Sequence, residues 1–142
     1  MEAFEKTIIN LISLKQEGAY WDFKREWYDS NHSTNLLHDI ICMSNNLVNR
    51  DAYIIIGIDE EDDYKVKDIL NDTNRKNTQK IVDFLKDKKF AGDIRPIVYV
   101  DSIKFVKGVI DIIVIQNSSN TPIYLKEKYK GVFANHIYTR IQ

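Results

Sequence analysis

The stretch that decides the fold is Ala52-Tyr53-Ile54-Ile55-Ile56-Gly57-Ile58-Asp59. Its near-continuous run of apolar, largely β-branched residues predicts a strand from Tyr53 to Ile58 that is covered on both faces. Such a strand needs other elements packed above and below its sheet. The sequence therefore indicates a mixed α/β architecture.

Helices and strands are expected on both sides of this stretch. Apolar residues at helical spacing predict a helix from Ala3 to Lys15, a central helix with a stripe from Leu36 to Val48, and a third helix from about Asn74 to Lys86. Alternation from Tyr20 to Trp27 predicts a strand, with Asp22 and Lys24 on the same face.

Four further strands are expected in the second half. Pro96 to Phe105 and Val109 to Gln116 flank the turn signal Lys107-Gly108, and two short strands follow at Ile123–Lys126 and Ile137–Arg140. The prediction is a mixed α/β sandwich with about three helices and six strands, in a single domain spanning residues 1–142.

The composition restricts the class of protein. The chain is 44% hydrophobic, its formal net charge is −1 and its pI is near 6.3. Its apolar runs fall short of the roughly 20 residues that span a bilayer, and its N-terminus does not resemble a secretory signal, so we expect a cytoplasmic protein without membrane association. The single cysteine, Cys42, lies in a helical pattern and is expected to be buried.

Nucleic-acid binding, if it occurs, must depend on local charge, because the whole chain is not cationic. Lysines cluster late in the chain, and Lys126, Lys128 and Arg140 are the candidates there for contacts with phosphates. Tyr20 and Tyr28 are candidates for stacking on unpaired bases. The alternative is that these lysines only keep the protein soluble.

Three carboxylates are candidates for a metal site. Glu17 and Asp22 stand five residues apart around a short aromatic segment, and Asp59 ends the apolar run. Divalent cations prefer such hard oxygen ligands, and a metal-held water that attacks a phosphodiester benefits from a nearby cation such as Lys24. Without further support, the more ordinary interpretation of these residues is that they are exposed surface charges.

Five segments in register make the chain resemble the Schlafen-type, AlbA-like family of DNA- or RNA-binding domains, once labelled divergent ATPases. They are the acid-x4-acid-Phe-Lys motif at Glu17–Lys24, the helix end at Ser44–Asn46, the strand at Tyr53–Asp59, and the segments Thr121–Tyr124 and Ile137–Arg140. The resemblance implies the fold described above. From the nucleases of this family it implies a three-carboxylate, metal-dependent site that cuts RNA, formed here by Glu17, Asp22 and Asp59 with Mg²⁺ or Mn²⁺ as cofactor.

The chain departs from the family pattern at two places. Asp22 stands where glutamate is usual, which shortens the reach of that ligand by one methylene. Asn49-Arg50-Asp51 replaces a glycine pair that often precedes the apolar strand. Many family members also continue into further domains, so this chain is either a free-standing protein or an N-terminal domain.

Several functions remain open at this point. The first is a nucleic-acid-binding module, and the second is a metal-dependent ribonuclease, so the sequence does not decide whether the chain is an enzyme. The third is a regulatory or assembly domain that acts through protein partners or as a homodimer, for example in bacterial or phage transcription or defence. ATP binding is not expected, because the five glycines are unpaired and there is no P-loop.

Overall fold

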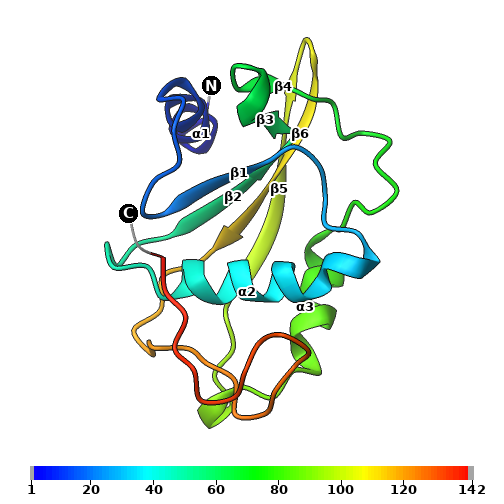
Figure 1. The fold of residues 1–142 in the computed structure, drawn as a ribbon. Helices are drawn as coiled ribbons and strands as arrows, with labels where there is room; N and C mark the ends of the chain where they lie inside the picture. The colour runs from blue at the N-terminus through cyan, green and yellow to red at the C-terminus, as the bar shows by residue number, and fades with distance from the viewer. Residues whose placement is uncertain (1, 141–142) are drawn as a thin grey trace.

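The structure is a computed structural model that describes residues 2–140 (Figure 1). Its helices are α1 (Ala3–Ser13), α2 (Ser33–Ser44) and α3 (Thr78–Lys86), with 3-10 turns η1 (Ser30–His32), η2 (Glu60–Asp62) and η3 (Ala91–Asp93). Its strands are β1 (Trp21–Lys24), β2 (Ala52–Ile56), β3 (Ile58–Asp59), β4 (Lys65–Val66), β5 (Val98–Phe105) and β6 (Gly108–Ile115). The mixed α/β class and the counts of three helices and six strands are confirmed.

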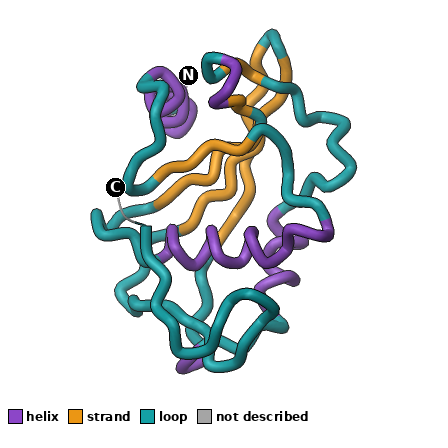
Figure 2. Tube along the Cα trace, in the orientation of Figure 1, coloured by secondary structure: helices purple, strands orange, loops and turns teal. Residues whose placement is uncertain are grey.

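A four-stranded sheet in the order β1-β2-β6-β5 forms the middle layer. β1 runs parallel to β2, with Asp22 opposite Ile54, and the β2–β6 and β6–β5 pairs are antiparallel. β1 is therefore an edge strand. Figure 2 shows the strands between α1 on one side and α2 on the other.

The residues of β2 explain why one strand can organise two cores. Ala52, Ile54 and Ile56 pack into a cluster with α2 and α3, whereas Tyr53 and Ile55 pack into a second cluster with α1. All five are buried, the most exposed at 7%. Both faces of the strand thus lose water, which provides the main stabilisation of such a layer.

The apolar run ends where its backbone turns. Gly57 has φ +109°, a conformation that L-residues with a side chain rarely adopt. Ile58 and Asp59 beyond it leave the main sheet and pair with β4 as β3. The predicted single strand to Ile58 is therefore two strands, and the acidic residues that follow turn toward α1's side of the molecule (Figure 1).

Two expectations about regular structure were wrong. Leu47 and Val48 do not continue the buried stripe of α2, because the helix ends at Ser44 and both side chains are largely exposed. Ile123–Lys126 and Ile137–Arg140 are not strands in the described chain, and the short pair β3–β4 makes up the count instead. Within residues 2–140, no helix combines the length and the apolar character needed to cross a membrane.

Asn45 fastens these late segments to the end of α2. Its side chain donates to the carbonyls of Ile123 (2.8 Å) and Tyr138 (3.0 Å) and accepts from the Ile123 amide (2.8 Å), while Thr139 Oγ1 donates to its backbone oxygen (2.7 Å). A buried polar side chain thus replaces a β-ladder. We call residues 137–140 the C-terminal strap; it carries Arg140 toward β1.

Candidate metal and nucleic-acid site

Three carboxylates meet beside the edge strand β1. Glu17, Asp22 and Glu60 each offer one oxygen, and these oxygens all lie within 4.8 Å of one another. We call this group the acidic cluster. One ion with metal–oxygen bonds of about 2.1–2.4 Å spans oxygens up to about twice that length apart, so the spacing and the ligand type both suit a divalent cation.

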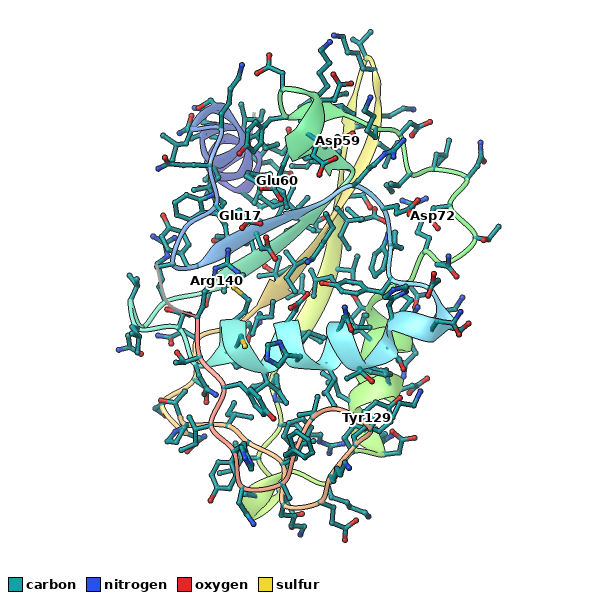
Figure 3. The ribbon with its side chains drawn as sticks, in the orientation of Figure 1. Glu17, Asp59, Glu60, Asp72, Tyr129 and Arg140 are labelled. Atoms are coloured by element: carbon teal, nitrogen blue, oxygen red, sulfur yellow. The ribbon has the colours of Figure 1, made fainter. Side chains whose placement is uncertain are left out.

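Each member of the acidic cluster is positioned by a different element. Glu17 follows α1, where Gly18 forms a bridge to Trp21 that turns the chain into β1. Asp22 lies in β1, is 5% exposed, and has one oxygen fixed by the Phe23 amide at 2.9 Å. Glu60 lies in η2, after β3, and Figure 3 shows it on the same side as Glu17.

The predicted third acid, Asp59, is not part of this group. Its side chain instead caps η2 by accepting from the Glu61 amide at 3.0 Å, and its other oxygen lies 3.7 Å from Arg25 Nε. The neighbouring Glu60 points into the cluster in its place. The available signal was Asp59 followed directly by acidic residues, which is a typical start of a helical turn.

Two cations flank the acidic cluster. Lys24 Nζ lies 3.4 Å from both Asp22 and Asp39, and Arg140 Nη2 lies 3.5 Å from Glu17 and 3.8 Å from Asp22. Both Lys24 and Arg140 were sequence candidates, and the structure brings them to the first two predicted acids. Asp39 on α2 was not foreseen.

The acidic cluster carries more negative charge than these cations neutralise. Glu60 is the exposed member of the cluster. Partial burial of its carboxyl, reinforced by the charge and the hydrogen bond of Glu17, raises the pKa of Glu60 from 4.5 to about 7. The charges of Lys24 and Arg140 lower this pKa, but they do not offset the burial and the charge of Glu17. A divalent cation would supply the missing positive charge, so the residues present fit the metal that the sequence resemblance implies.

The aromatic candidates are less available than expected. The ring of Tyr20 is covered on one side by the Arg50 guanidinium at 3.9 Å and packs edge-on against Trp21 and Tyr53. Tyr28 is buried and donates to Asp39 at 2.6 Å.

Cys42 is only half-buried, less than the sequence predicted. Burial, followed by the charge of Asp39, raises its pKa to about 11. A thiol with so high a pKa is almost wholly protonated near neutral pH, so Cys42 is a poor nucleophile.

A second charged region lies beyond α2, on the side of Tyr129 in Figure 3. Residues 78–95 and 126–130 carry eight basic and four acidic side chains, a net charge of +4 in a chain whose total is −1. The two segments lie side by side, because Lys126 donates its amide to the Lys89 carbonyl at 2.8 Å and Phe90 bridges to Leu125. We call this region the basic end.

The basic end exposes most of its lysines. The exposed ones include Lys86, Lys89, Lys126, Lys128 and Lys130. Two of them make weak polar contacts: Lys126 Nζ lies 3.6 Å from an Asp93 carboxylate oxygen, and Lys130 donates a hydrogen bond to Ser33 at 3.1 Å. Most of the local positive charge therefore faces solvent, where polyanions can reach it.

The chain matches a known protein family. The family described as Schlafen, AlbA_2 matches residues 17–142, which is nearly the whole chain and begins at the first acid of the cluster. The chain belongs to the Schlafen AlbA_2 family. No curated protein shows significant similarity to it.

Membership of the Schlafen AlbA_2 family points to a function related to nucleic acids. The matched range contains the acidic cluster, its two flanking cations and the basic end.

Proposed function

We propose that this Schlafen AlbA_2 domain binds nucleic acid and uses the acidic cluster as a divalent-metal site for cutting RNA. The observation that carries the proposal is the convergence of Glu17, Asp22 and Glu60 within 4.8 Å, with Lys24 and Arg140 beside them. Glu17, Asp22 and Glu60 would hold Mg²⁺ or Mn²⁺. A metal held this way polarises a phosphate and lowers the pKa of a bound water.

Lys24 has a distinct part in this proposal. Its side chain is 34% exposed, and Asp22 and Asp39 hold its ammonium from two sides at 3.4 Å each. An ammonium so oriented next to the metal ligands offsets charge that builds on a phosphate oxygen during hydrolysis. Tyr28 fixes Asp39 in turn through its 2.6 Å hydrogen bond.

The basic end contributes affinity for nucleic acid without sequence specificity. Figure 3 shows Tyr129, in the basic end, across α2 from Glu17 and Glu60. A nucleic-acid strand bound at both the acidic cluster and the basic end would cross α2. Lysine contacts to phosphates release counterions, so binding through Lys128 and Lys130 should weaken steeply as salt rises.

The test is incubation of labelled tRNA and labelled single-stranded DNA with the protein, in Mn²⁺, in Mg²⁺ and in EDTA. Metal-dependent cleavage of RNA, lost in Glu17→Gln, Asp22→Asn and Glu60→Gln, is the expected result. A salt-sensitive gel shift without cleavage under any condition would reduce the proposal to a binding module.

Absence of both cleavage and binding would contradict the proposal altogether. The earlier alternative, a regulatory or assembly domain with protein partners, would then be the one to pursue, beginning with whether the chain is a homodimer.

A further inference from the structure

Arg140 is held against the acidic cluster by more than charge. Its Nε donates to the Gly18 carbonyl at 2.7 Å, and Nη2 lies 3.5 Å from Glu17 and 3.8 Å from Asp22. The side chain is only 17% exposed. The guanidinium thus lies at the place where the first two metal ligands converge.

The C-terminal strap delivers this guanidinium from far along the chain. Asn45 binds the strap at Tyr138 and Thr139, directly before Arg140. A cavity of about 250 Å³ adjoins the strap and α2, lined in part by His38, Cys42 and Arg140 itself. The backbone is therefore fixed close to Arg140, and its long side chain has space beside it.

From this placement we propose that Arg140 is the built-in counter-cation of the acidic cluster: it neutralises Glu17 and Asp22 until a divalent cation displaces it, and the released guanidinium then contacts a phosphate. The inference rests on the proposed metal site. A guanidinium and a metal ion would compete for the carboxylates of Glu17 and Asp22, and their like charges repel at a separation of a few ångströms.

The counter-cation role predicts a direction of change in metal affinity that a purely structural role of Arg140 does not. Removing the positive charge of Arg140 should tighten metal binding, because the ion no longer competes with the guanidinium. The same change should weaken RNA binding, because a phosphate contact is lost. If Arg140 only oriented the carboxylates, its removal would weaken metal binding as well.

The experiment is calorimetric titration of Mn²⁺ into wild type, Arg140→Gln and Arg140→Lys. The control variant is Arg25→Gln, which removes a positive charge near the acidic cluster that pairs with Asp59 instead of Glu17 or Asp22. Arg140→Gln should lower the Kd for Mn²⁺ by about tenfold, a change expected when a competing charge leaves a partly buried site. Arg25→Gln should change it less than twofold.

The possible results separate this inference from the proposal it rests on. If wild type and Arg140→Gln both fail to bind Mn²⁺, the metal site itself is refuted. If wild type binds Mn²⁺ and Arg140→Gln binds it equally or more weakly, the counter-cation role alone is refuted.

A second measurement follows Arg140 in the unaltered protein and needs a variant only to assign the signal. The Nε–H group of Arg140 gives a distinct NMR signal, assigned by its absence in Arg140→Lys. Saturating Mg²⁺ should shift this signal and speed its exchange with water, as the bond to Gly18 breaks. An unchanged signal under Mg²⁺ saturation would overturn the displacement of Arg140.

Discussion

Replacing Asn45 with alanine tests whether one buried amide holds the late part of the chain in place. The side chain of Asn45 is 7% exposed and makes three hydrogen bonds, two to Ile123 and one to Tyr138. Loss of three bonds at about 1 kcal/mol each, with the buried Ile123 amide left without its partner, costs about 3–4 kcal/mol. For a domain of this length that corresponds to a Tm lower by about 10–15 °C.

The assay is urea unfolding with thermal unfolding as a second readout. Asn35→Ala is the matched control, because Asn35 lies exposed on α2, the helix that Asn45 follows, and its loss should change stability by less than about 0.5 kcal/mol. Asn45→Ala should also raise the exchange rate of amides in the C-terminal strap. A cost below 1 kcal/mol, or strap amides that exchange as in wild type, would refute the reasoning.

Three further predictions follow from single groups. In EDTA, the raised pKa of Glu60 means that protonation of this carboxyl stabilises the folded state. The stabilisation is complete below about pH 4.5 and is lost as the pH rises to about 7. The Tm of wild type should therefore fall between about pH 5 and 8, and Glu60→Gln should flatten that fall. A wild-type Tm that rises over this range would contradict the contact with Glu17. The carboxylate of Asp111 is 1% exposed, accepts a hydrogen bond from Trp27 at 2.9 Å and pairs with Arg75 at 2.8 Å. Asp111→Ala should therefore lower the free energy of unfolding in urea by about 3–5 kcal/mol. A loss below about 1 kcal/mol would contradict a buried ion pair there. Lys128→Gln should lower the slope of log affinity for RNA against log salt by about 0.7–0.9 if Lys128 contacts a phosphate, as filter binding would measure; an unchanged slope would remove it from the interface.

The sequence was sufficient where a pattern has one physical solution. A short apolar run that is rich in β-branched residues favours a strand covered on both faces, and β2 is buried on both sides by α1 and by α2 with α3. Lys107-Gly108 between two apolar strands predicted the β5–β6 hairpin for a similar reason, because Gly108 has φ +148° there.

The third acid of the site could not be read from the same pattern. Asp59 and Glu60 are neighbours, and which of them reaches Glu17 depends on the turn η2. In that turn an Asp59 carboxylate oxygen accepts a hydrogen bond from the Glu61 amide, and the longer Glu60 side chain enters the acidic cluster. The competition between a cap and a ligand is local geometry, and residue type alone does not resolve it.

Hydrogen bonds between residues far apart in the chain could not be predicted from the sequence either. The strap segment around Tyr138 and Thr139 contains residue types that favour strands, and it was predicted as one. In the structure its hydrogen bonds go to Asn45, 93 and 94 residues away along the chain. No local pattern signals that a side chain will satisfy a distant backbone.

The most direct test of the acidic cluster compares Glu60→Gln with Asp59→Asn in Mn²⁺ titrations and in RNA cleavage. The two residues are adjacent, both are acidic, and each variant removes one negative charge. The account predicts that Glu60→Gln loses Mn²⁺ affinity and cleavage, whereas Asp59→Asn keeps both. Loss in Asp59→Asn with retention in Glu60→Gln would contradict the cluster that the structure forms.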